Sequence, residues 1–122
     1  MMPAMPERVL IVDDHAGFRG EARRLLQEIG RQVVGEAGTG AEALSEARRL
    51  KPDLVLLDIQ LPDLDGLAVA ASLSSEPQPP AVVLVSSRDA GDYGPRLFGC
   101  GALGFIPKAD LSAESLMALL EA

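Results

Sequence analysis

The sequence predicts a doubly wound α/β fold, with a five-stranded parallel sheet covered by helices on both faces. Strand-like and helix-like patterns alternate five times along 122 residues, a length typical of one compact domain. The strand-like runs are almost wholly apolar, as expected for parallel strands that are buried on both faces. Because crossover connections between parallel strands are right-handed, few topologies remain, and we expect the strand order 2-1-3-4-5.

The first two strand–helix units occupy the residues up to Pro52. Arg8–Val12 is the first predicted strand, and the amphipathic helix after it ends at Gly30. The apolar face of this helix consists of Phe18, Ala22, Leu25, Leu26 and Ile29. Residues 32–36 predict a short second strand at the edge of the sheet. The run TGAE at residues 39–42 has the spacing of a capping box, so a second helix begins there.

The remaining units follow the same alternation. The run DLVLLD at residues 53–58 predicts the third strand, and a third helix follows its loop. Ala81–Ser86 and residues 102–106 predict the fourth and fifth strands, and Ser112 caps the last helix. The fourth helix, at residues 92–99, is the weakest element because it contains Gly94 and Pro95, which disfavour a helix interior. We expect it to be short or mobile.

Composition argues against several classes of protein. Eleven Lys and Arg residues against eighteen Asp and Glu residues give a net charge of −7, which disfavours binding of nucleic acid or an anionic membrane by this domain. No apolar run approaches the roughly 18 residues of a membrane span, and the first residues lack a signal-peptide pattern. The single cysteine, Cys100, cannot form an internal disulfide and is expected to be a packing residue. We therefore expect a cytoplasmic protein.

Polar residues follow four of the five predicted strands. Asp13 and Asp14 come after the first strand, Asp58 ends the third, Ser86 ends the fourth, and Lys108 follows the fifth. In an open parallel sheet, ligands bind beyond the carboxyl ends of the strands, where the winding direction switches. Three carboxylates, a hydroxyl and an ammonium group are therefore expected at one edge of the sheet.

The grouped carboxylates predict a magnesium site. Burying a carboxylate is costly unless it is paired or coordinates a cation. Mg²⁺ prefers oxygen ligands and binds through one or two carboxylates, waters and phosphate oxygens. With the negative charge offset by the ion, Asp58 can attack a phosphoryl group, because carboxylates are covalent phosphoryl acceptors. Lys108 and Ser86 then supply a cation and a hydrogen bond to the phosphoryl oxygens.

Three motifs carry a resemblance to a known family. VLIVDDH with the FR pair after it, DLVLLDIQLPDLDG and GALGFIPK are similar to the corresponding motifs of response-regulator receiver domains. The resemblance covers nearly the whole chain and is strongest to NarL/LuxR-type receivers. It implies the flavodoxin-like (CheY-like) form of the fold and a role in two-component signalling, in which a sensor histidine kinase donates a phosphoryl group in the presence of Mg²⁺.

The resemblance also implies roles for the residues of the acidic site. Asp58 matches the phospho-acceptor, which is also a metal ligand. Asp14 matches a direct Mg²⁺ ligand and Asp13 its partner, which often acts through water. Gln60 matches the position whose backbone carbonyl completes the metal shell, and Lys108 matches the phosphate-binding lysine.

Further residues match the switch of the family. Ser86 corresponds to the hydroxyl that moves toward the phosphoryl group, and Phe105 to the aromatic side chain that turns inward. These movements change the partners of a face formed by the fourth helix, the fifth strand and the fifth helix, which is a population shift between two packings. Arg88 and Gln60 occupy positions that tune the lifetime of the phosphoryl group.

The resemblance implies a switch module and not an enzyme, with self-catalysed phosphorylation and dephosphorylation. Its partners would be a sensor histidine kinase and a downstream output domain or protein. The switch face is a candidate surface for pairing of two copies, and the oligomeric state stays open. The receiver domain is expected to span residues 1–122, with no output domain and no helix-turn-helix in this sequence. The output would be transcription if a DNA-binding domain follows in the full-length protein.

Other classes fit the motifs less well. A haloacid-dehalogenase-like phosphatase also uses Asp, Mg²⁺ and Lys, but it requires DxD after the first strand and a cap. The DxHxxG motif of a cobalamin binder is nearly met by Asp13 and His15, but Phe18 stands where glycine is required. A stand-alone receiver that acts by protein–protein contact is a further alternative. We expect His15 to be a loop residue beside the site, and Asp63 and Asp65 to be solvated turn formers.

Overall fold

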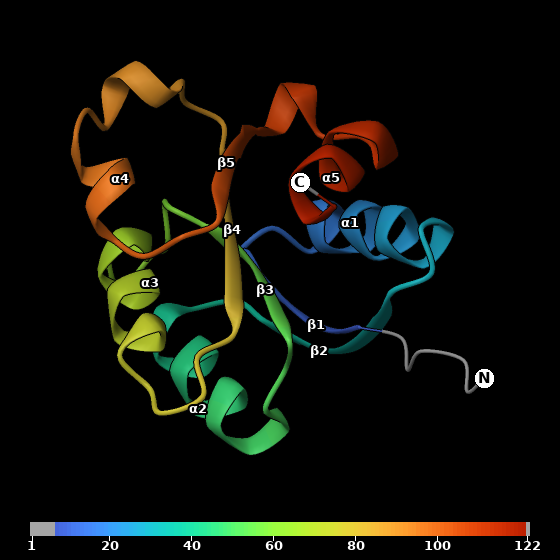
Figure 1. Ribbon diagram of the computed structural model, residues 1–122, viewed down its shortest axis with the longest axis horizontal. Helices are drawn as coiled ribbons and strands as arrows, with labels where there is room; N and C mark the ends of the chain where they lie inside the picture. Colours follow the sequence, from blue (N-terminus) through green and yellow to red (C-terminus); the bar gives the residue numbers. More distant parts are fainter. Residues whose placement is uncertain (1–6, 122) are drawn as a thin grey trace.

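The computed structural model describes residues 7–121, which contain a five-stranded parallel sheet with the strand order β2-β1-β3-β4-β5 (Figure 1). The strands are β1 (Arg8–Val12), β2 (Gln32–Ala37), β3 (Leu54–Asp58), β4 (Ala81–Ser86) and β5 (Gly104–Pro107). Each pair of neighbouring strands is parallel. The predicted doubly wound architecture and strand order are confirmed.

Helices cover both faces of the sheet. One face carries α1 (Ala16–Glu28) and α5 (Ala113–Leu120), and the other carries α2 (Gly40–Leu50), α3 (Gly66–Ser74) and α4 (Arg96–Gly99) (Figure 1). Two 3-10 turns, η1 (Ala90–Asp92) and η2 (Lys108–Asp110), precede α4 and α5. No helix within residues 7–121 is long and apolar enough to cross a membrane.

Alternate residues of the strands supply two separate cores. Along β1, Val9 and Ile11 point into the core under α1 and α5, whereas Leu10 and Val12 point into the core under α2 and α3. All four side chains are fully buried. Burial on both faces explains why the central strands read as continuous apolar runs and not as alternating ones.

The fifth strand begins later than the sequence predicts. The chain leaves α4 through Gly101, whose φ of 83° lies in the left-handed region that favours glycine. Leu103 donates its N–H to the Val82 carbonyl at 2.7 Å, but regular pairing starts only with Gly104 opposite Val83. The turn at Gly101 therefore takes up residues that the apolar pattern assigned to the strand.

Side-chain caps begin α2 and α5 as predicted. Thr39 Oγ1 accepts the backbone N–H of Glu42 at 3.1 Å, and Ser112 Oγ accepts that of Ser115 at 3.0 Å. Each hydroxyl satisfies one of the backbone donors that a helix leaves free in its first turn. The two capped starts therefore fix where the chain enters each helix.

The loop between β3 and α3 caps two helices. Asp63 accepts the backbone N–H of Gly40 at 2.7 Å and that of Ala41 at 3.0 Å, so it caps α2 from a distant part of the chain. Asp65 Oδ1 accepts the N–H of Leu67 at 2.9 Å and caps α3. Both aspartates are exposed turn residues, as predicted, but the sequence reasoning did not assign them these caps.

The chain between β4 and β5 contains little regular structure. The 3-10 turn η1 has three residues and α4 has four. Between them, Gly94 has a φ of 61° and Pro95 occupies the N-cap position of α4. Phe98 of α4 is 89% exposed. The prediction of a short fourth helix is confirmed.

Candidate functional site

Two buried aspartates lie side by side at the carboxyl edge of the sheet. Asp13 directly follows β1 and Asp58 ends β3, and the pairing of Val12 with Leu57 brings the two strand ends together. Asp13 is fully buried and Asp58 is 2% exposed, whereas Asp14 faces solvent beside them. The register of adjacent parallel strands thus assembles the cluster of carboxylates.

The donor atoms of this cluster fit a hard divalent cation. Asp13, Asp14, His15 and Asp58 each offer one oxygen or nitrogen, and these atoms lie within 4.8 Å of one another. Asp13 Oδ1 accepts the backbone N–H of His15 at 2.8 Å. Its Oδ2 is buried and accepts no well-formed hydrogen bond, although Lys108 Nζ lies 2.6 Å away. Three carboxylates, one of which has a buried oxygen without a well-formed hydrogen bond, form an oxygen-rich set that suits Mg²⁺.

Lys108 supplies the positive charge of the site. It begins η2 directly after β5, and its Nζ also lies 3.2 Å from Asp58 Oδ2 and 4.3 Å from the centroid of the Phe18 ring. Burial opposes the charged form of Lys108, but the contacts with Asp13 and Asp58 outweigh it and raise the pKa. The ammonium group therefore stays charged beside both carboxylates.

Burial is the main influence on the acid–base behaviour of Asp58. It raises the pKa of Asp58 to about 6, and the negative charge of Asp13 acts in the same direction. The N–H of Gln60, which donates to Asp58 Oδ1 at 3.0 Å, and the charge of Lys108 oppose the increase. An additional cation would favour the ionised carboxylate.

A glycine allows α3 to begin against the end of β3. A Cβ on Gly66 would lie 2.4 Å from the Asp58 carbonyl oxygen and 2.5 Å from Ile59 Cα, so no larger side chain fits without movement. Gly66 donates its N–H to the Ile59 carbonyl at 2.8 Å, which closes the loop. The glycine therefore holds the loop that carries Gln60 close to Asp58.

Ser86 and Phe105 lie on neighbouring strands beside Asp58. Ser86 ends β4 and is fully buried, and Phe105 on β5 lies opposite Leu84 of β4. Ser86 Oγ accepts the backbone N–H of the exposed Arg88 at 3.0 Å and lies 2.5 Å from the hydroxyl of Tyr93. Sequence reasoning did not single out Tyr93, because no motif or spacing connects it with the strand ends.

The comparison with protein families identifies the chain. The family of the response regulator receiver domain matches residues 9–121. This chain belongs to the response-regulator receiver family. The prediction of a receiver domain from the sequence motifs is therefore confirmed.

Curated relatives of this receiver include transcriptional regulators. The response regulator GacA of Pseudomonas viridiflava is 40% identical over 113 residues, which are 92% of this chain and 53% of that protein. The transcriptional regulatory protein PdtaR of Mycobacterium tuberculosis is 40% identical over 107 residues, 86% of this chain and 51% of that protein. The chain spans about half the length of the curated relatives it matches.

Solved structures confirm the CheY-like fold of this receiver. The signal receiver domain of the protein named NarL from Mycobacterium tuberculosis is 36% identical, with a TM-score of 0.87 over 97% of this chain and 96% of that one. A LuxR-family response regulator from Aurantimonas is 27% identical, with a TM-score of 0.86 over 96% of this chain and 84% of that one. The expected similarity to NarL/LuxR-type receivers is therefore confirmed.

Helix α1 of the receiver contacts the acidic site through Arg19. Arg19 Nη1 donates to the Asp13 carbonyl at 2.6 Å, and its Nε donates to Glu36 at 2.9 Å. Arg23 also binds Glu36, and its hydrogen bond holds the pKa of Glu36 below the usual range against the effect of burial. His15 is exposed beside the site, and its Nδ1 lies 3.0 Å from Asp14 Oδ1, as expected for a loop residue there.

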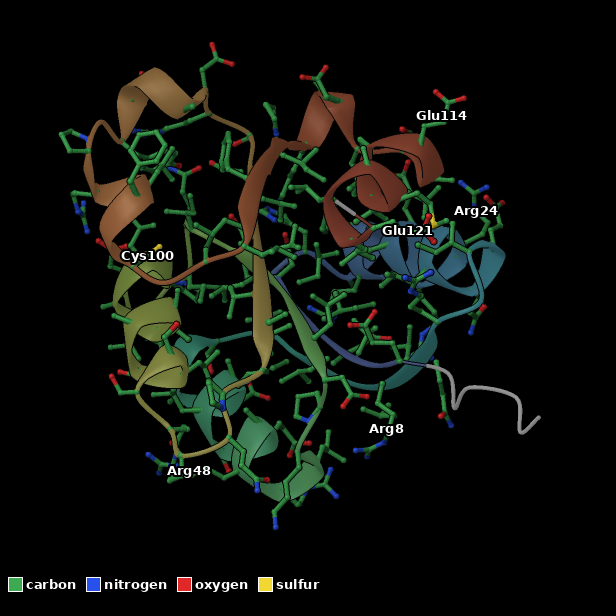
Figure 2. All side chains as sticks on the ribbon, viewed as in Figure 1. Arg8, Arg24, Arg48, Cys100, Glu114 and Glu121 are labelled. Atoms are coloured by element: carbon green, nitrogen blue, oxygen red, sulfur yellow. The ribbon has the colours of Figure 1, made fainter. Side chains whose placement is uncertain are left out.

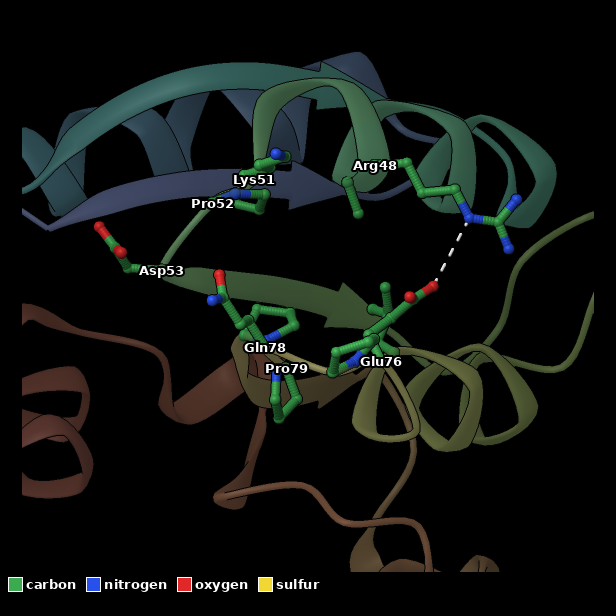
Figure 3. A pocket seen from close by; sticks show the side chains of 11 residues that line it. Arg48, Lys51, Pro52, Asp53, Glu76, Gln78 and Pro79 are labelled. Atoms are coloured by element: carbon green, nitrogen blue, oxygen red, sulfur yellow. Dashed lines mark ion pairs between the residues drawn. The ribbon is translucent and has the colours of Figure 1, made fainter.

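A cavity of about 590 Å³ lies at the opposite end of the receiver, where the strands begin (Figure 3). The segment around Pro52 before β3 and the turn that contains Pro79 before β4 line it. Arg48 and Glu76 form an ion pair across it at 3.5 Å (Figure 3). None of the predicted site residues lines this cavity.

The cysteine of the receiver is a packing residue. Cys100 is buried where α4 meets α3 (Figure 2). Its Sγ lies 3.5 Å from the Leu97 carbonyl oxygen, and its own carbonyl accepts the Ser74 hydroxyl at 3.3 Å. Cys100 belongs to the core under α2 and α3, which agrees with the packing role expected from the sequence.

Proposed function

We propose that this receiver accepts a phosphoryl group on Asp58 from the phosphohistidine of a sensor kinase and then acts as a switch. The observation that carries the proposal is the set of charged groups around the buried Asp58 carboxylate. Asp13 and Asp14 lie within metal-binding distance of it, and Lys108 Nζ lies 3.2 Å from its Oδ2. A nucleophile, a set of metal ligands and a phosphate-binding cation are thus combined at one sheet edge.

The side chains of Asp13, Asp14 and Asp58 would hold Mg²⁺, together with the backbone carbonyl of Gln60. Bound Mg²⁺ would supply charge neutralisation and orientation of the phosphoryl oxygens. Two observations support this assignment. The carboxylate oxygens are grouped, and the buried Oδ2 of Asp13 has no well-formed hydrogen bond. The exposed Asp14 lies on the side from which an ion and its waters can enter.

Asp58 acts as the nucleophile of the transfer. A carboxylate oxygen of Asp58 donates an electron pair to phosphorus, and the P–O bond forms as the P–N bond of the phosphohistidine breaks. The imidazole nitrogen of the kinase keeps the electron pair of the broken P–N bond and takes up a proton. Lys108 Nζ then pairs with the phosphoryl oxygens, because formation of the acyl phosphate removes the negative charge of the Asp58 carboxylate.

Hydrolysis returns the site to its starting state without a separate enzyme. Water attacks phosphorus, the P–O bond to Asp58 breaks, and inorganic phosphate leaves as the carboxylate is restored. Gln60 and Arg88 lie on the two loops that flank the site, which supports their proposed influence on the phosphoryl lifetime. The receiver therefore acts on its own side chain and not on a separate substrate.

The phosphoryl group changes the packing of the switch face. Ser86 donates its hydroxyl to a phosphoryl oxygen and Phe105 turns inward, so the surface of α4, β5 and α5 changes partners. That surface would contact the output domain or protein and would also serve for pairing of two copies. Relatives named as transcriptional regulators support a transcriptional output in the full-length protein. The receiver itself, with a net charge of −7, would not bind DNA, and we propose a cytoplasmic location.

Phosphorylation with a small donor tests the proposal. Incubation with acetyl phosphate and Mg²⁺ should add one phosphoryl group, which intact-mass spectrometry detects, and peptide mapping should place it on Asp58. The Asp58→Asn variant should stay unmodified, whereas Asp110→Asn, which changes an exposed aspartate of η2, should react like the wild type. Modification of Asp58→Asn at the same rate would overturn the assignment.

A further inference from the structure

Tyr93 connects Ser86 to the β4–α4 segment, which we define as residues 88–99. Its Oη lies 2.5 Å from Ser86 Oγ, and its ring lies edge-on to Phe105 with 6.2 Å between the centroids and an angle of 64°. Ser86 is fully buried, and the same Oγ accepts the N–H of Arg88 at 3.0 Å. Two groups of the β4–α4 segment, the Tyr93 hydroxyl and the Arg88 N–H, are therefore hydrogen-bonded to the Ser86 hydroxyl.

Few polar contacts hold the β4–α4 segment against other elements. Among the described residues, its side chains make two such contacts, the hydrogen bond between Tyr93 and Ser86 and the ion pair between Arg96 and Asp65. Leu97 adds an apolar contact with the core. Of these side-chain contacts, that of Tyr93 is the one to the end of β4.

We propose that Tyr93 is a positioning residue, whose hydroxyl holds Ser86 on the β4–α4 segment until Asp58 is phosphorylated. The inference rests on the proposed function of Asp58. A serine hydroxyl carries one proton, and the contact with Tyr93 fixes the direction in which Ser86 Oγ points. A phosphoryl group on Asp58 competes for that hydroxyl, because a hydrogen bond to an anionic oxygen is stronger than one between neutral groups. When Ser86 turns toward Asp58, Tyr93 loses its partner.

Loss of this hydrogen bond releases the β4–α4 segment. Gly94 and the four-residue α4 give the segment little local stability of its own. The Phe105 ring has no hydroxyl, so of the two neighbouring aromatic rings only that of Tyr93 can bond to Ser86. The movement of Tyr93 also changes the edge that its ring presents to Phe105, which connects the acidic site with the surface of β5.

A double-mutant cycle tests whether Tyr93 acts through Ser86. Beryllofluoride, a phosphoryl mimic, is titrated with Mg²⁺ into the wild type, Tyr93→Phe, Ser86→Ala and the double variant. Removal of one holding hydrogen bond in Tyr93→Phe should lower the half-saturating concentration about two- to tenfold. In the Ser86→Ala background, Tyr93→Phe should have no effect. Ser75→Ala, which removes the hydroxyl of an exposed serine at the end of α3, should match the wild type.

The unmodified protein offers a second measurement. The chain contains one tyrosine and no tryptophan, so its tyrosine fluorescence reports on Tyr93 alone. Addition of beryllofluoride and Mg²⁺ should change this emission, because the hydroxyl loses its hydrogen-bond partner. Ser86→Ala should show the changed emission before any addition. Amide hydrogen exchange across residues 88–99 should increase in the same samples.

The outcomes separate this inference from the proposal on which it rests. If the wild type binds no beryllofluoride, the phosphorylation proposal fails, and the inference fails with it. If it binds, then an unchanged affinity of Tyr93→Phe, or an equal effect with and without Ser86, overturns the role of Tyr93 alone. Should Tyr93→Phe not fold, the wild-type fluorescence decides, and emission unaffected by beryllofluoride overturns the inference.

Discussion

Lys108 Nζ lies 2.6 Å from Asp13 Oδ2, and this ion pair joins the end of β5 to the end of β1. Two strands, β3 and β4, separate these elements in the sheet, so the lysine side chain reaches across the carboxyl edge. On its way it also contacts Asp58 at 3.2 Å. The single positive charge of Lys108 therefore pairs with two buried carboxylates. The site keeps a net negative charge, which favours binding of a divalent cation.

Replacing Lys108 should separate phosphoryl binding from metal binding. We expect Lys108→Ala to weaken binding of beryllofluoride and signalling strongly, because the cation for the phosphoryl oxygens is lost. Mg²⁺ affinity should be retained, since the carboxylates that hold the ion remain. Without Mg²⁺, the free energy of unfolding should fall by about 3 kcal/mol, because a buried carboxylate loses its partner. Titrations followed by NMR at residues 13, 14 and 58 measure both affinities.

Lys51 provides a matched control for that experiment. It lies at the end of α2 with a φ of 50°, a left-handed conformation that asparagine tolerates better than most residues. Lys51→Asn removes the same charge far from Asp58 and should leave both affinities unchanged. Equal losses of beryllofluoride and Mg²⁺ affinity in Lys108→Ala would contradict the separate roles.

The raised pKa of Asp58 predicts a pH dependence of stability in metal-free protein. A carboxyl group with a pKa of about 6 in the folded state is above its unfolded value, so its stabilising effect is present at low pH. That effect is lost as the pH rises from the unfolded pKa through about 6. Asp58→Asn should therefore unfold at a higher temperature than the wild type at pH 7 with EDTA. The difference should shrink at pH 4 and when Mg²⁺ is added.

Gly66→Ala should damage both the fold and the site. The new Cβ would lie 2.4 Å from the Asp58 carbonyl oxygen, which is backbone and cannot move independently. We expect a loss of about 1–3 kcal/mol in the free energy of unfolding and slower phosphorylation by acetyl phosphate. Gly20→Ala in α1 meets no atom within 4 Å and should instead gain about 0.5–1 kcal/mol. Urea denaturation compares the two variants, and equal stability would refute the steric argument.

Asp63 should titrate below the usual range of an aspartate. The N–H groups of Gly40 and Ala41 stabilise its ionised form and lower its pKa. The stability it contributes is present above the unfolded pKa and is lost as the pH falls through the lower folded value. NMR titration of the Asp63 carboxyl carbon measures this directly. Asp63→Ala should speed amide exchange at Gly40 and Ala41 at neutral pH, and an unchanged rate would exclude the cap.

The acidic cluster was predictable because strand ends are visible in the sequence. Asp13, Asp58 and Ser86 each follow an apolar run directly, and parallel strands bring such positions to one edge. Lys108 follows the fifth run in the same way. The residues that could be predicted are therefore those whose position depends on the strand pattern alone.

Contacts made through loops could not be predicted in this way. Asp63 caps α2 because the loop after β3 folds back over it, and no local pattern connects Asp63 with Gly40. Tyr93 reaches Ser86 because the chain turns through η1 between them, within a stretch that has no helical period. Arg19 likewise binds Asp13 through the way α1 packs on β1. These contacts depend on three-dimensional geometry, to which hydrophobic periodicity is insensitive.

The ion pair of Lys108 with Asp58 joins residues 50 positions apart in the chain. During synthesis on the ribosome, a nascent chain could complete the first four strands and bury Asp58 before Lys108 had left the exit tunnel. Such an intermediate would lack the ammonium group and the last helix. A growing chain therefore completes the carboxylate–ammonium arrangement of this site only after residue 108 has left the tunnel, whatever length of chain has already folded.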